Sequence, residues 1–281
     1  MKKIVVYIFA YSLFIPCALL AQSKDSSILT AGMEPIAKFS KLIPGEFISA
    51  EVDILGNMYL LTTSNQLQKI SPAGEKLSIF NDVKKYGNPS LINVRNPLKV
   101  IVYYPQFATI VTLNQALSVI NSINLRNQNI FNVHAVATAY DNTLWIFDEQ
   151  DFKIKKINDQ GKVLLESNDM RMMTSNLPTA TQLIDAANQL FLYDPIKGLY
   201  RFDYYGAYVS LLPIKGWKNI IVENNRIYGF VSNSILVYRL DTMQEQAYPL
   251  PASIGSYLSI KIANGQLYVL TKRGLEIYQL L

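Results

Sequence analysis

The sequence predicts an all-β protein, a six-bladed β-propeller that a strand from near the N-terminus closes. Three observations predict this fold. A unit of short strands and polar turns recurs six times along the chain. The period of this unit is about 40–45 residues, which is typical of propeller blades with four strands each. No stretch after the first 21 residues has an apolar pattern of helical period over a useful length.

The repeated unit consists of an alternating strand, a turn with Asn, Asp or Gly, an apolar and aromatic strand, a short loop and a further strand. Its clearest copy runs from Asp53 to Glu75, and the copy that contains Lys99 is the most degenerate. Short runs rich in Val, Ile, Tyr and Phe between such turns indicate strands. The third strands of the six copies align on these apolar residues: Ile70, Leu113, Ile157, Phe202, Leu240 and Leu280.

The two ends of the repeat region predict how the ring closes. The sixth copy reaches Leu281 after its third strand, so it lacks an outer strand. Residues 35–42 read as a strand that belongs to no blade of its own. Because an open blade would leave unpaired N–H and C=O groups on its edge, we expect residues 35–42 to pair beside residues 276–280. An open solenoid is the alternative arrangement.

The first residues have the order of a secretory signal peptide. Lys2 and Lys3 precede an apolar run from Ile4 to Leu20, and Ala21 offers a cleavage point. We therefore expect a signal peptide at residues 1–21, a linker at residues 22–32 and the propeller at residues 33–281. A retained membrane anchor is the alternative, because the run is close to the lower limit of about 17 residues for a membrane span. After cleavage we expect no membrane span.

The single cysteine and the charge balance restrict the chemistry of the mature protein. Cys17 lies within the leader, so cleavage after Ala21 leaves no thiol for a disulfide, redox chemistry or a thiolate metal site. Lipidation of Cys17 is the alternative fate of this residue. The chain has 26 basic and 21 acidic residues, and removal of two leader lysines leaves 24 − 21 = +3. No long run of like charge appears, which argues against nucleic acid as a partner.

Two segments resemble known classes of protein. Asp53-Ile-Leu-Gly-Asn-Met-Tyr-Leu and Leu67-Gln-Lys-Ile-Ser-Pro-Ala-Gly-Glu resemble the blades of NHL-type and related six-bladed propellers, and the resemblance extends over nearly the whole mature chain. Such propellers include protein-binding modules and hydrolases, so the resemblance implies a fold and not a function. The leader that ends in Ala21-Gln22 is similar to those of Gram-negative exported proteins of the type nine secretion system. This similarity implies residence in the periplasm or on the periplasmic side of the outer membrane.

Five long loops are expected to share one face of the propeller. The connections between second and third strands lie at the same end as the connections between blades, and binding residues concentrate on loops that a rigid scaffold holds. The five loops are residues 81–90, 104–108, 147–152, 167–178 and 214–217. The candidate binding residues on them are Tyr104, Phe107, Asp148, Glu149, Asp151, Arg171, Met172, Met173 and Trp217.

These candidates allow both functional and structural interpretations. The three acidic residues from Asp148 to Asp151 could form a cation site or an acid/base pair, but a solvated turn is the favoured interpretation. Methionines beside Arg171 suit adaptable protein contacts, and Arg and Trp are enriched at interfaces; alternatively, the methionines fold under their loop. Tyr104 and Phe107 either stack on a ligand or cover the end of the core.

Catalytic motifs are missing from the sequence. His134 is the only histidine, and no Gly-x-Ser-x-Gly elbow or Asp-x-Asp-x-Asp-Gly calcium loop is present. We therefore expect no catalytic residue, no cofactor and no bound transition metal, while calcium stays open because oxygen ligands are plentiful.

The sequence thus predicts a non-enzymatic, periplasmic, protein-binding propeller, with a cell-envelope or secretion complex as its setting. A metal-dependent lactonase-like hydrolase and a sugar-binding propeller are the alternatives, and any small-molecule ligand is unknown. The lactonase would need Glu, Asn and Asp side chains that converge on one ion in the central channel.

Overall fold

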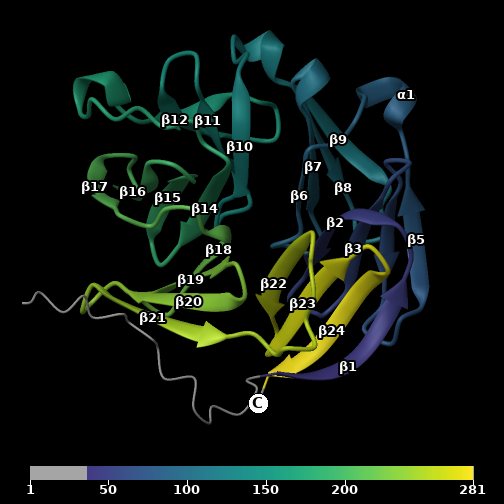
Figure 1. The fold of residues 1–281 in the computed structure, drawn as a ribbon. Helices are drawn as coiled ribbons and strands as arrows, with labels where there is room; N and C mark the ends of the chain where they lie inside the picture. Colours follow the sequence, from purple (N-terminus) through teal and green to yellow (C-terminus); the bar gives the residue numbers. More distant parts are fainter. Residues whose placement is uncertain (1–36, 281) are drawn as a thin grey trace, which may run out of the picture. The chain divides into compact units, whose positions relative to one another are not determined.

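Six antiparallel sheets of four strands each form the described part of the chain, residues 37–280 of a computed structural model (Figure 1). Contacts divide the chain into Met1–Glu34 and Pro35–Leu281, and all described residues belong to the second unit. The predicted signal peptide and linker lie outside the described residues. Within these residues, the prediction of a six-bladed, all-β propeller is confirmed.

Each of the first five blades uses four consecutive strands, from the inner strand outward. Blade 1 consists of β2 (Phe47–Val52), β3 (Met58–Thr62), β4 (Leu67–Ile70) and β5 (Lys76–Phe80). Blade 2 consists of β6 (Leu91–Asn93), β7 (Val100–Tyr104), β8 (Thr109–Leu113) and β9 (Val119–Asn124). Blade 3 consists of β10 (Val133–Thr138), β11 (Leu144–Asp148), β12 (Lys153–Ile157) and β13 (Val163–Glu166). Blade 4 consists of β14 (Gln182–Ala186), β15 (Gln189–Asp194), β16 (Gly198–Asp203) and β17 (Tyr208–Leu212). Blade 5 consists of β18 (Lys218–Glu223), β19 (Arg226–Val231), β20 (Ser234–Arg239) and β21 (Gln244–Pro249).

The sixth blade joins the two ends of the described chain. It consists of β22 (Ser259–Ala263), β23 (Gln266–Thr271), β24 (Gly274–Leu280) and, as its outer strand, β1 (Ala37–Pro44). β1 pairs antiparallel with β24, with Ala37 opposite Leu280 and Pro44 opposite Gly274 (Figure 1). The predicted closure by the N-terminal strand is therefore confirmed, and it pairs the edge that β24 would otherwise expose.

The inner strands surround a central channel. β10 contacts β6 and β14, β18 contacts β14 and β22, and β22 contacts β2. The hydrophobic core lies between blades, in six clusters that each join two neighbouring sheets. For example, Trp145 and Phe147 of blade 3 pack with Tyr200 and Phe202 of blade 4. Because both faces of a middle strand are covered, every residue of β7, β8 and β11 is buried, rather than every second one.

The two ends of the propeller differ in their connections. We call the end that carries the turns between first and second strands and between third and fourth strands the turn face. The opposite end, which carries the connections between second and third strands and between blades, is the loop face. All four short helices of the described chain lie on the loop face: α1 (Val83–Tyr86), η1 (Pro105–Phe107), η2 (Leu125–Gln128) and η3 (Met170–Met172).

One side-chain pattern builds turns on the turn face of four blades. In each, a carboxylate or amide Oδ1 accepts hydrogen bonds from the backbone N–H groups two and four residues later, at 2.8–3.0 Å. Such bonds satisfy the backbone within the turn itself. The four residues are Asp53, Asn114, Asn158 and Asp203.

Candidate functional site

The loop face is a ring of mutually bonded loops. Every connection between a second and a third strand exchanges a hydrogen bond with a connection between blades. The backbone N–H of Glu149, for example, donates to Asn132 O at 2.9 Å, and that of Gly216 donates to Pro195 O at 2.7 Å. The five long loops predicted to share one face therefore do so, and their backbones are held in place.

Two of the three aromatic residues among the predicted binding residues are buried instead of exposed. Tyr104 is 2% exposed and its ring lies 5.3 Å from that of Tyr86. Trp217 is 4% exposed and packs into the core between blades 4 and 5, where its backbone oxygen accepts a hydrogen bond from Tyr193 at 2.7 Å. Burial raises the pKa of Tyr193 to about 12. These aromatics close the ends of the core, which corrects the expectation that Trp217 anchors a partner.

The acidic cluster is divided between two structural roles. Asp148 is buried, and Lys155 Nζ lies 2.8 Å from its Oδ2 and 2.6 Å from Asp151 Oδ2. Burial acts to lower the pKa of Lys155, but its hydrogen bonds to the two carboxylates outweigh burial and raise it. This buried ion pair corrects the expectation of a solvated turn at Asp148. Glu149 forms no ion pair with Lys155; its Oε1 instead accepts a hydrogen bond from the backbone N–H of Ala180 at 3.1 Å.

The lone histidine lies beside Glu149 on the exposed loop face. His134 Nε2 is 3.8 Å from Glu149 Oε2 and 3.0 Å from Asn132 Oδ1. Within residues 37–280, no three His, Asp or Glu side chains lie close enough together to hold a metal ion.

The other candidates lie on the surface of the loop face. Phe107 and Met173 are partly exposed, and Met172 is 86% exposed. Arg171 Nη2 lies 2.6 Å from Asp169 Oδ2, and Asp169 Oδ1 also accepts from Arg171 N at 2.9 Å. Because Met170 is fully buried beneath η3, this loop has one methionine folded under it and one directed outward.

Sequence reasoning missed several exposed apolar residues on the loop face. Ile196 is 79% exposed on the tight loop between β15 and β16. The remaining ones, all about half exposed, are Phe131, Ile48 and Leu258. The sequence does contain a signal for the exposure of Ile196. This apolar residue lies between Pro195 and Lys197, after the alternating pattern of the strand has ended.

Asp194 fixes the loop that presents Ile196. Its Oδ1 accepts from the N–H groups of Ile196 and Lys197 at 2.7 and 3.0 Å, and its Oδ2 accepts from Thr179 N at 2.8 Å. Burial opposes ionisation of Asp194, but these three donors outweigh it and hold its pKa below the usual range.

The central channel has a volume of about 700 Å³ and two cross-blade ion pairs. Lys261 of blade 6 pairs with Glu51 of blade 1. Arg95 Nη1 of blade 2 lies 2.9 Å from Asp185 Oδ1 of blade 4. Each carboxylate named here therefore already has a cationic partner.

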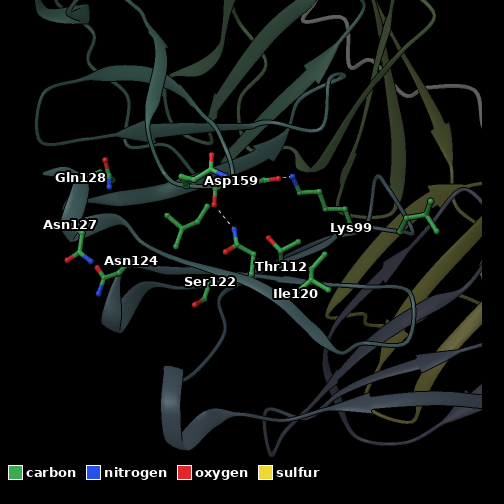
Figure 2. A pocket seen from close by; sticks show the side chains of 12 residues that line it. Lys99, Thr112, Ile120, Ser122, Asn124, Asn127, Gln128 and Asp159 are labelled. Carbon is green, nitrogen blue, oxygen red and sulfur yellow. Dashed lines mark hydrogen bonds and ion pairs between the residues drawn. The ribbon is translucent and has the colours of Figure 1, made fainter.

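A second concavity of about 640 Å³ lies on the outer side, between β9 and the turn of residues 158–162 (Figure 2). Lys99 Nζ and Asp159 Oδ1 are 2.5 Å apart, and Asn121 Nδ2 donates to Asp159 O at 2.5 Å. Figure 2 shows Asn124, Asn127 and Gln128 at the other end of this groove. Its charged pair neutralises itself, so the groove surface is mainly one of amides and hydroxyls.

No family model matches this sequence, and no curated protein is similar enough to count as a match. No helix in the described part of the chain has the length and apolar character to cross a membrane. Solved structures with a similar fold include three very different proteins. Virginiamycin B lyase from Staphylococcus aureus has a TM-score of 0.61 at 11% identity, over 87% of this chain and 98% of the lyase.

The other two are single domains by name. The WD40 domain of Neurospora crassa Pan2 has a TM-score of 0.64 at 9% identity, over 88% of this chain and 96% of that domain. The extracellular domain of a hybrid two-component system from B. thetaiotaomicron has a TM-score of 0.58 at 19% identity, over 83% of this chain and 33% of that one. At these identities the likeness concerns the fold alone, and the six four-stranded sheets make the described chain a six-bladed β-propeller.

Proposed function

We propose that this protein is a non-enzymatic binding module that contacts a protein partner with its loop face. The observation that carries this proposal is the set of exposed apolar side chains on loops whose backbones are fixed. Ile196 and Met172 are both largely exposed, and both belong to segments that an Asp side chain caps. Exposed apolar side chains in fixed positions favour association, because little conformational freedom is lost on binding.

The chemistry of the acidic residues supports a binding role over catalysis. Asp148 is neutralised by Lys155, Asp194 is saturated by backbone donors, and Glu51 is paired with Lys261. A lactonase-like centre would require such oxygen ligands to converge on one ion. The contact surface that we propose includes the predicted residues Phe107, Arg171, Met172 and Met173, together with Ile196 and Phe131.

The setting that we propose is a complex of the bacterial cell envelope, on the periplasmic side. The order of charge, apolar run and small residue at the N-terminus supports export. A secretion complex related to type nine secretion is the narrower form of the same proposal, and it rests on the leader alone.

Affinity capture from detergent-solubilised envelopes tests the proposed face. We compare the wild type with Met172→Ser plus Ile196→Ser, and require that the captured protein also binds when purified. Loss of central anchors typically costs about 2 kcal/mol or more, so we expect at least tenfold lower affinity with an unchanged melting temperature.

The matched control removes two exposed apolar side chains from the opposite end. Leu55 and Met243 are both exposed on the turn face. Leu55→Ser plus Met243→Ser should leave capture unchanged. If this control pair abolishes capture while the loop pair does not, the partner uses the turn face. If neither pair lowers affinity, the loop-face proposal is wrong.

A further inference from the structure

The loop-face mouth of the channel gathers hydrogen-bond donors. The inner strands begin at this mouth, so residues at or close to their starts form its wall. The polar side chains that line it from five blades are Ser49, Ser90, Gln182, Lys218 and Ser259. The hydroxyls of the three serines and the ammonium of Lys218 make no hydrogen bond within the described protein, so these donors are free for a ligand.

The charges along the channel wall are unbalanced in favour of cations. The channel is lined by Arg95, Lys218 and Lys261 but by one carboxylate, that of Glu51. Lys261 is paired with Glu51 and Arg95 with Asp185, which leaves Lys218 without an acidic partner among residues 37–280. Concave, low-dielectric walls concentrate the field of such a charge, so the mouth attracts anions.

The wall around Lys218 is rigid. Gln182 Nε2 of blade 4 donates to Ile220 O of blade 5 at 2.8 Å, and Asn219 Nδ2 of blade 5 donates to Ile260 O of blade 6 at 2.5 Å. These bonds lie on both sides of β18, whose first residue is Lys218. The backbone that carries Lys218 is therefore held in place before any ligand arrives, which lowers the cost of binding.

An apolar rim adjoins the donors. Ile48 and Leu258 are each about half exposed, line the channel and directly precede Ser49 and Ser259. A ligand whose anionic group lies among the donors would place its next atoms against these two side chains. The channel volume is within the range of about 300–1,000 Å³ that is usual for small-molecule sites.

From this arrangement we infer that the channel mouth binds an anionic oxygen group, a carboxylate or phosphate, that is attached to a short apolar chain. Such a group could belong to a free amphiphile or to the end of a polypeptide. The site depends on the channel wall and not on the partner surface around Ile196, so it stands or falls independently of the proposed function.

Fluorescence titration of the purified propeller tests this site. Trp217 lines the channel, whereas Trp145 is fully buried between blades 3 and 4 and supplies a constant background. The probes are hexanoate, acetate, hexyl phosphate, hexanol, acetyl-Leu-Leu with a free carboxylate, and the amide of that peptide. We expect saturable binding of at least one anionic probe, weaker binding in high salt, and none of the amide or of hexanol.

Variants at two nearby lysines decide whether the site is specific. Lys218→Gln should lower affinity about tenfold, and Lys218→Arg should retain most of it. Lys215→Gln is the matched control, because Lys215 is exposed in the connection just before β18 but does not line the channel. Ile48→Ser should weaken hexanoate more than acetate. Melting temperatures of all variants should match the wild type.

Each outcome of the titration bears on the proposal. Binding of hexanoate or hexyl phosphate without the peptide supports the site and identifies a free amphiphile as its ligand. Binding of the peptide acid alone supports the site and identifies a chain end. The proposal is overturned if no anionic probe binds, if the amide or hexanol binds as tightly, or if Lys215→Gln weakens binding as much as Lys218→Gln.

Discussion

The turn face and the loop face of this propeller are connected by the same strands but satisfy their backbone groups in different ways. On the turn face, one side-chain oxygen closes a five-residue turn in each of four blades, as at Asp203. On the loop face, the Oδ1 atoms of Asp148, Asp169 and Asp194 accept from the N–H two residues later but not from the N–H four residues later, and neighbouring loops also bond to each other. The comparison teaches that the repeated sequence builds the scaffold, while the face without repetition carries the candidate surfaces.

The largest effect that we expect concerns ring closure, on which both faces depend. Gly274 begins β24 with a φ of 137°, and a Cβ there would lie 2.2 Å from Ile43 O of the closing strand. Gly274→Val should separate β1 from β24 and cost about 4 kcal/mol or more. Chemical denaturation monitored by circular dichroism measures this loss.

Gly216 supplies the control for closure, because it also has a positive φ, 72°, but has open space around its Cβ position. Gly216→Ala should cost only about 1 kcal/mol, the strain of a left-handed backbone. Equal losses for the two variants would show that backbone strain, and not strand separation, dominates at Gly274.

The next effect concerns the turn face. Asp53 is buried and accepts hydrogen bonds from the backbone of Leu55 and Asn57, the Asn57 amide and the Tyr59 hydroxyl, at 2.9–3.1 Å. Asp53→Ala leaves these donors unpaired and should cost about 3 kcal/mol in unfolding free energy. Channel binding of anions should not change.

An exposed acid on the same face provides the comparison for Asp53. Asp241 pairs with Arg239 in solvent, and such pairs contribute little to stability. The Asp241→Ala variant should therefore have a melting temperature close to that of the wild type. If it destabilises the protein as much as Asp53→Ala, the buried turn pattern is not what stabilises this face.

A smaller, pH-dependent effect separates structure from binding on the loop face. The three backbone donors lower the folded-state pKa of Asp194 relative to about 3.9 in an unfolded chain. The carboxylate therefore stabilises the fold above pH 4, and this contribution is lost as the pH falls through the folded-state pKa. Asp194→Asn should cost about 2 kcal/mol at pH 7, because the amide N–H₂ cannot accept from Thr179.

Unfolding curves of wild type and Asp194→Asn from pH 7 to pH 2.5 measure this dependence. The difference between them should shrink as the pH falls below about 4. A difference that stays constant over this range would mean that the Asp194 charge makes no contribution and that shape alone holds the loop.

The sequence was sufficient for the fold because its turns repeat. Asp53 and Asp203 occupy similar turns, and five of the six aligned apolar residues lie in third strands, whereas Leu240 falls one residue after β20. The blades and their closure could therefore be aligned from the sequence alone. The placement of loops on one face followed from strand order. Both predictions depend on the order of residues within short segments, which can be read directly from the sequence.

The exposure of individual loop residues could not be predicted in this way. Trp217 is buried because its ring fills space against Gly229 of a neighbouring strand, whereas Ile196 projects from a turn that Asp194 holds. Asp148 is neutralised by Lys155, which the hairpin of β11 and β12 places diagonally across from it, opposite Ile146. The burial or exposure of these side chains depends on contacts between different segments of the chain, and the repeat pattern does not predict those contacts.

The smallest effect is also the one that most directly tests the distinction between the residues that hold the loop face and those that it presents. Ile196 is 79% exposed, and its side chain contributes to none of the six core clusters. Ile196→Ser should therefore change the unfolding free energy by no more than about 0.5 kcal/mol, as for other surface substitutions. Its neighbour Leu199 is fully buried in the core between blades 4 and 5. Leu199→Ala should therefore lower the unfolding free energy by about 3 kcal/mol. A loss of more than about 1 kcal/mol of unfolding free energy in Ile196→Ser would mean that this side chain packs against another loop. Ile196 would then stabilise the fold, and the contact with a partner that we propose for it would be wrong.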